Sequence, residues 1–130
     1  MAYKNTFITV APDCPVDVAE TPTTNRPTPT RTMLEHRLLQ DAPYSQDHRA
    51  FSYAVHHAQK GREAKTFDEF HSKGQPCMRA SPLTKRYGCG AHYDDHGNIA
   101  IYPKGSDDYA RLSDPKNNLS VIPAMRNKRA

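Results

Sequence analysis

Proline and glycine interrupt this chain so often that its helices and strands must be short. Proline fixes φ and lacks a backbone N–H, and glycine favours turns, so both tend to end regular structure. Pro12 ends a strand predicted over residues 5–11, and Pro43 ends the first predicted helix. The longest interruption is the Thr/Pro-rich segment 21–32. It is expected to bury little and to form an extended surface loop within a single domain spanning residues 1–130.

Two or three helices are predicted between residues 30 and 72. The first runs from a cap at Thr30 or Thr32 to Gln40, and the second runs from a cap at Ser45 to Lys60, where Gly61 ends it. A third is predicted over residues 62–72, with Phe67 and Phe70 facing inward.

The second half of the chain predicts a hairpin and short helical turns. Ser81-Pro82 favours one helical turn through Arg86, because proline suits the first helical position. Residues 89–94 and 98–102 are typical of a β-hairpin, and Ser106 caps a short helix. Residues 119–125 are predicted as a last strand, which Pro123 either confines to an edge or splits. The fold class is therefore α+β: a small, mostly antiparallel sheet with the helices of residues 30–72 packed on one face.

Positive charge is concentrated in the second half of the chain. The net charge is +4, and hydrophobic residues make up only 36%, which predicts a modest core. Residues 1–71 hold 8 Lys and Arg against 9 Asp and Glu, whereas residues 72–130 hold 10 against 5. This imbalance indicates either an anionic ligand or partner, or a solvated basic surface.

The strongest candidate site is the glycine-rich basic segment 72–93, which contains no Asp or Glu. Glycines allow close backbone approach to a ligand, and unopposed cations attract anions. The leading hypothesis is a non-enzymatic binding module for an anionic small molecule or nucleic acid. Its proposed ligand-binding residues are Lys73, Arg79, Ser81, Lys85 and Arg86.

Two other functions stay open. A small cysteine-dependent enzyme would use Cys77 as nucleophile with a histidine such as His92 as base, because nearby cations favour a thiolate. A protein-interaction adaptor would use the basic C-terminal tail. The sequence leaves the oligomeric state open.

Cofactors, metals and membranes are not expected. Cys89, His92 and His96 show a C-x2-H-x3-H spacing, but a strand sends Cys89 and His92 to opposite faces. The three cysteines are too few for a disulfide scaffold, and no apolar run is long enough for a membrane span. A cytoplasmic protein with reduced thiols is expected.

The segment Ser72–Tyr93 contains the run Lys73-Gly-Gln-Pro-Cys-Met-Arg-Ala-Ser-Pro-Leu-Thr-Lys-Arg-Tyr-Gly88. This segment resembles a family of small bacterial proteins whose domain has no known function. The similarity extends from Asn5-Thr-Phe-Ile8 to the terminal Ala124-Met-Arg-Asn-Lys-Arg-Ala130. It implies a single-domain bacterial protein, and it implies no mechanism or site.

Overall fold

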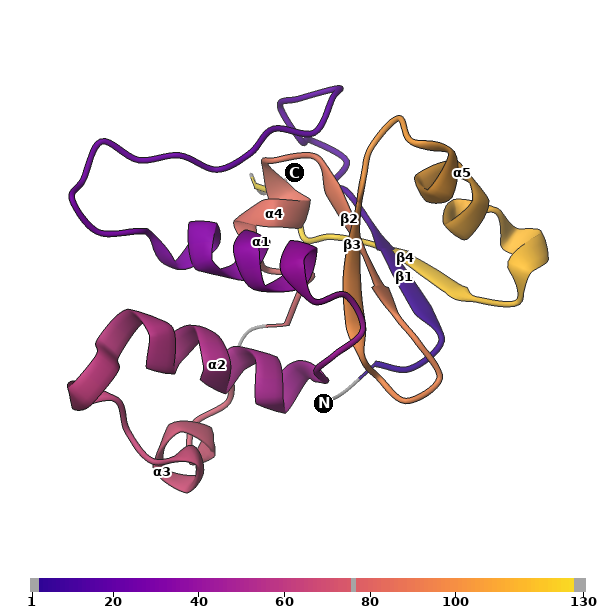
Figure 1. Cartoon of the computed structure of the whole chain (residues 1–130). Coiled ribbons are helices and arrows are strands. Elements are labelled where there is room, and N and C mark those ends of the chain that lie inside the picture. Colours follow the sequence, from indigo (N-terminus) through magenta and orange to yellow (C-terminus); the bar gives the residue numbers. More distant parts are fainter. Residues whose placement is uncertain (1–2, 76, 128–130) are drawn as a thin grey trace.

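A four-stranded sheet organises the protein (Figure 1). The computed structural model describes residues 3–75 and 77–127. The strands β1 (Thr6–Thr9), β2 (Cys89–Tyr93), β3 (Ile99–Pro103) and β4 (Ser120–Pro123) lie in the order β3-β2-β1-β4. β2 is antiparallel to both β1 and β3, and β4 is parallel to β1. The predicted α+β class with a mostly antiparallel sheet is confirmed.

The main core lies between one face of the sheet and three helices: α1 (Arg31–Asp41), α2 (His48–Lys60) and the short α4 (Pro82–Lys85). Ile8, Ala91 and Tyr93 come from the strands, and each is fully buried. Leu39, Phe51 and Val55 pack against them from α1 and α2. Figure 1 shows α1 lying across the strands, with α2 beyond it.

The opposite face of the sheet packs against α5 (Asp107–Ser113). The rings of Phe7 and Tyr109 meet edge to face at 5.2 Å between centroids. Gly90 lies beneath them, and a Cβ there would lie only 2.5 Å from Phe7 Cζ. Since Phe7 and Ile8 are neighbours on β1, they point to opposite faces and both faces are covered.

The helix boundaries follow the capping residues. Thr30 caps α1 and Ser81 caps α4, as predicted. The predicted cap of α2 at Ser45 is wrong: Asp47 Oδ1 accepts the Ala50 N–H at 2.9 Å, and Ser45 instead donates to the Ala42 carbonyl.

The predicted helix over residues 62–72 is shorter than expected. A single 3-10 turn at Gly61–Glu63 is followed by α3 (Phe67–His71), which starts at a capping box formed by Thr66 and Glu69. Phe70 is buried as predicted, but Phe67 is exposed. A second 3-10 turn, Pro115–Asn117, precedes β4.

The Thr/Pro-rich segment forms neither helix nor strand over residues 21–30. As expected, this segment buries little: most of residues 21–30 are exposed, and Pro22 is buried among them. The chain just before it is also held, because the Glu20 N–H donates to the Tyr87 carbonyl at 2.9 Å. Gly88, at φ +78°, lies against the backbone of Ala19, and a Cβ there would lie only 3.0 Å from Ala19 Cα. Residues 19–22 are therefore part of the packed structure.

Candidate functional site

The basic residues of segment 72–93 make separate structural contacts. Arg79 Nε donates to the Pro123 carbonyl at 2.9 Å and holds the end of β4. Arg86 Nε donates to Asn127 Oδ1 at 3.2 Å, and the Asn127 amide donates to the Lys85 carbonyl at 2.9 Å. Lys73 is exposed. Of these cations only Arg86 lines one of the three main cavities of the described residues.

Ser81 contacts a carboxyl group of the protein itself. Its hydroxyl donates to Glu35 Oε1 at 2.8 Å and accepts the Leu83 N–H at 3.2 Å. Arg31 Nε lies 3.6 Å from Glu35 Oε2. Burial raises the pKa of Glu35, and the bonds from Ser81 and Arg31 oppose that rise. The place where the sequence predicted an external anion therefore holds the Glu35 carboxyl group.

Cys77 borders a cavity of about 210 Å³ that Glu35, Ser81 and Arg31 also line. His92 lies elsewhere: it pairs with Phe7 across the β1–β2 register, on the face that α5 covers. Its Nδ1 lies 2.7 Å from the Tyr44 hydroxyl. The structure therefore does not bring the predicted nucleophile and its predicted base together.

Cys89 and His92 also point to opposite faces of β2. Cys89 is buried in the main core, and burial raises the pKa of its thiol to about 11. Within residues 3–75 and 77–127, no three His, Cys, Asp or Glu side chains converge in a way that could hold a metal ion.

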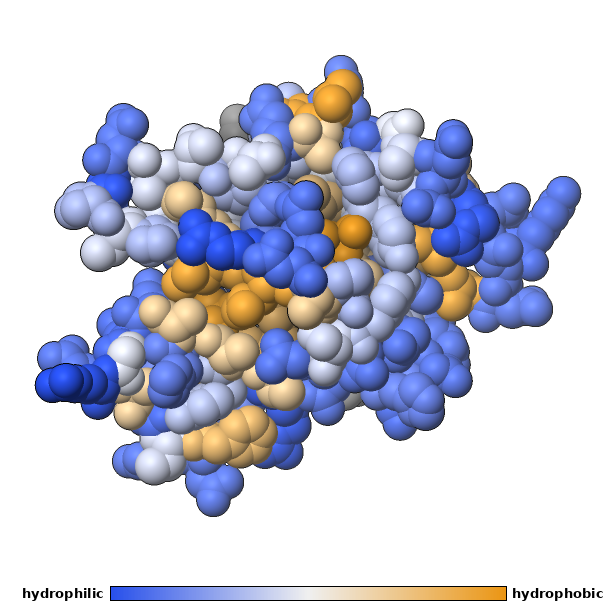
Figure 2. Space-filling view, viewed as in Figure 1, coloured by the Kyte–Doolittle hydropathy of each residue, from blue (hydrophilic) through white to orange (hydrophobic). Residues whose placement is uncertain are grey.

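A cavity of about 410 Å³ lies between α1, the outer edge of β3 and residues 19–21. Its volume falls within the range of about 300–1,000 Å³ common for small-molecule sites. The apolar part of its wall comes from Ala19, Leu39, Pro43, Ala100, Ile101 and Pro103. Figure 2 shows hydrophobic residues gathered between α1 and α2 in the middle of this face, with hydrophilic residues over α1 and around them.

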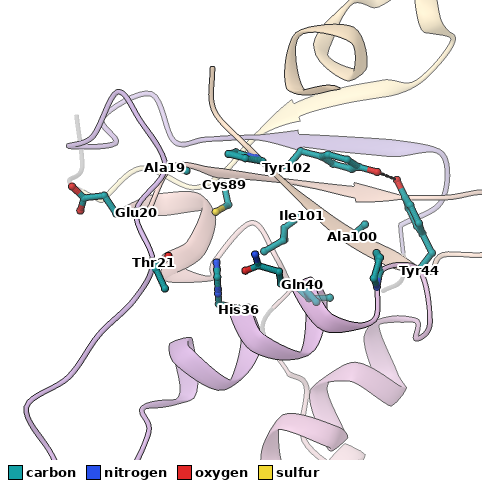
Figure 3. Close-up of a pocket in the computed structure, with 13 residues that line it drawn as sticks. Ala19, Glu20, Thr21, His36, Gln40, Tyr44, Cys89, Ala100, Ile101 and Tyr102 are labelled. Carbon is teal, nitrogen blue, oxygen red and sulfur yellow. Dashed lines mark hydrogen bonds between the residues drawn. The ribbon is translucent and has the colours of Figure 1, made fainter. Parts of the chain in front are cut away.

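Polar groups approach this cavity from the middle and the C-terminal end of α1. His36 and Gln40 are four residues apart, so they lie on one side of the helix. Figure 3 shows both pointing from α1 toward β3, with the paired Tyr44 and Tyr102 at the far end. Thr21, Glu20 and Cys89 complete the wall.

Tyr44 is held in place by its backbone and its hydroxyl. It has a left-handed φ of +59°, which is uncommon for a residue other than glycine. Its N–H donates to the Ile99 carbonyl at 2.9 Å, and its hydroxyl lies 2.6 Å from that of Tyr102. Burial and the bond to Tyr102 raise the pKa of Tyr44, so this phenol stays protonated. The structure thus fixes the protonated Tyr44 hydroxyl against the Tyr102 hydroxyl at the end of the cavity.

The cavity carries little positive charge. None of the described residues that line it is Lys or Arg. Burial lowers the pKa of His36, which favours its neutral form near pH 7. Glu20 is exposed at the rim. An uncharged ligand suits this lining better than an anion.

The residues of this cavity were not singled out in the sequence, except Cys89. The lining residues come from four separate parts of the chain and form no motif. The spacing of His36 and Gln40 on a predicted helix is a weak signal, since the same pattern occurs on ordinary solvated helix faces.

A search of curated proteins and a search of solved structures each found no match to this chain. One family model matches, and it covers residues 1–130. The chain belongs to the family of unknown function DUF6157.

Proposed function

We propose that this protein is a non-enzymatic binding module for a small, uncharged organic molecule, held in the 410 Å³ cavity beside β3. The observation that carries the proposal is the composition of the wall. Most of its surface is apolar, and the polar groups of His36, Gln40 and Tyr44 converge on it, which is the usual pattern of a small-molecule site.

The earlier hypothesis of an anionic ligand at segment 72–93 has less support. It needs the cations of this segment to meet at one place. Arg79 and Arg86 instead hold the C-terminal residues, and the Ser81 hydroxyl already donates to Glu35. These contacts favour structural roles for the three residues.

The test is an NMR titration of the 15N-labelled chain. One panel contains small uncharged heterocycles, and the other contains carboxylates and phosphates of matched size. We expect the uncharged panel to shift the amide signals of residues around the cavity, Ile101 among them. If only the anions bind, and they shift Arg79, Lys85 and Arg86 instead, the proposal is wrong.

A matched pair of variants locates the site. Gln40 is exposed at the cavity rim, so Gln40→Trp should close the entrance without disturbing the core. Arg37 is exposed on the same helix and does not line the cavity, so Arg37→Trp is the control. Loss of binding in the first variant alone supports the proposal, and equal binding in both contradicts it.

A thiol-dependent activity at Cys77 is the second candidate. The observation in its favour is the cavity that Cys77 shares with the buried Glu35. A catalytic thiolate would alkylate with iodoacetamide much faster than Cys14. Equal rates for Cys77 and Cys14, followed by mass spectrometry, would remove this candidate.

A further inference from the structure

The outer edge of β3 is paired at both of its ends. At one end, the Ile99 N–H donates to the Gln46 carbonyl at 3.0 Å, and the Ile99 carbonyl accepts the Tyr44 N–H at 2.9 Å. At the other end, the Pro103 carbonyl accepts the Ser106 N–H at 3.1 Å. Ile99 and Pro103 therefore direct their backbone polar groups away from β2.

Ile101 lies midway between these two residues. In an antiparallel ladder, successive residues direct their N–H and C=O groups to alternate sides, so Ile101 must point the same way as Ile99 and Pro103. The bond from the Lys104 N–H to the Gly88 carbonyl supports this, because it shows an even-numbered residue of this segment facing β2. Within the described residues, the outward N–H and C=O of Ile101 have no hydrogen-bond partner.

The large cavity lies against this edge, and four consecutive residues of β3, from Ala100 to Pro103, line it. The cavity therefore offers one backbone donor and one backbone acceptor from a single residue. A ligand that covers the Ile101 N–H and C=O without pairing with them would lose binding free energy, because both groups would lose their water. A ligand that forms hydrogen bonds with both groups gains affinity and a fixed orientation.

The two ends of the edge limit what can pair there. Residues 44–46 cover Ile99, and the turn that starts α5 covers Pro103. An added peptide strand needs several consecutive free residues, and among the described residues of this edge only Ile101 is open. The geometry favours a compact ligand over a β-strand partner.

Building on the proposed function, we propose that the ligand presents a cis-amide edge, as a lactam or a pyrimidine-type ring does. Such an edge carries a C=O acceptor beside an N–H donor, which matches the Ile101 N–H and C=O. A flat ring also fits between β3 and the apolar side chain of Leu39 on α1.

The test compares 2-pyridone with N-methyl-2-pyridone. Both rings carry the carbonyl acceptor, but the methylated ring lacks the N–H donor and places a methyl group against the Ile101 carbonyl. We expect 2-pyridone to bind about tenfold more tightly than N-methyl-2-pyridone. The methylated ring cannot donate a hydrogen bond to the Ile101 carbonyl, and its methyl group disturbs the pairing geometry. It should also shift the Ile101 amide proton downfield and slow its hydrogen exchange.

Each other outcome has a distinct meaning. If the two rings bind equally well in the cavity, the cavity proposal stands and the cis-amide inference is wrong. If other uncharged probes bind there but 2-pyridone does not, the inference is also wrong. If no uncharged probe binds, the proposed function itself fails.

A backbone variant gives a second readout. Ile101→Pro removes the outward N–H without breaking a bond to β2, and an edge strand tolerates proline at such a position. Ile101→Val keeps the N–H and serves as the control. We expect 2-pyridone binding to be lost in the first variant and kept in the second. Equal binding of 2-pyridone to both folded variants would overturn the inference. If the proline variant does not fold, the comparison of 2-pyridone with N-methyl-2-pyridone in the natural chain tests the inference alone.

Discussion

Ser81→Ala tests whether the contact between Ser81 and Glu35 stabilises the fold. Ser81 caps α4 through the Leu83 N–H, and a lost serine cap costs about 1 kcal/mol. Its hydroxyl also donates to Glu35 at 2.8 Å in a buried site, and losing that bond costs about 1–2 kcal/mol more. We therefore expect urea unfolding to show a loss of about 2–3 kcal/mol with an unchanged m-value.

Ser106→Ala is the matched control. Ser106 caps α5 by accepting the Tyr109 N–H at 3.2 Å, and no buried carboxyl group is involved. We expect it to cost only about 1 kcal/mol. In a Glu35→Gln background, the cost of Ser81→Ala should fall toward the same value, because the coupling to the carboxylate is gone.

The pH dependence separates the charge of Glu35 from its packing. Burial raises the pKa of Glu35 in the folded state above its ordinary 4.5, so the folded state favours the protonated carboxyl group. The stability that this shift adds is fully present below pH 4.5 and is lost as the pH rises through the folded-state pKa. Glu35→Gln should therefore gain stability relative to the natural chain as the pH rises above 4.5. If Ser81→Ala costs no more than Ser106→Ala, or costs the same in both backgrounds, the reasoning about this buried pair is refuted.

Three further predictions concern packing, the C-terminal contact and histidine protonation. Gly90→Ala places a Cβ 2.5 Å from Phe7 Cζ, so thermal unfolding should show a loss of about 1–3 kcal/mol; an unchanged Tm would mean that the α5 face is loosely packed. Arg79→Ala should weaken the attachment of β4, seen as faster amide exchange at Met125, and should leave binding of phosphate compounds unchanged; a loss of such binding would restore the anionic-ligand hypothesis. Burial lowers the pKa of four histidines below 6.5: His36, His48, His56 and His92. Their neutral forms therefore favour the folded state, and Tm should fall as the pH drops from about 7.5 to 5. A Tm that does not change over this pH range would contradict these pKa shifts.

Local chemistry in the sequence was a good guide to the secondary structure. Thr30 and Ser81 cap helices where predicted, and Gly61 ends α2 with a positive φ. These signals depend on neighbouring residues, so tertiary contacts rarely override them. Asp47 was missed as the cap of α2 because Ser45, two residues earlier, offers the same chemistry.

Charge was a poorer guide to the candidate site. Arg79, Ser81 and Arg86 carry the residue types of an anion site, but each has an internal partner far away in sequence. Glu35 lies 46 residues before Ser81, and sequence alone gives no reason to pair them. A basic segment therefore predicts attraction to negative groups without showing whether those groups belong to a ligand or to the protein.

The open edge of β3 depends on the topology of the sheet. Because β1 pairs with β2 on one side and β4 on the other, β3 is left at the edge, and residues 44–46 then cover only its first residue. The two backbone groups that remain belong to Ile101, whose side chain gives no sign of polar recognition. Any residue other than proline would present the same N–H and C=O. A search for functional residue types therefore passes over this position, whereas following the hydrogen bonds along the strand leads to it.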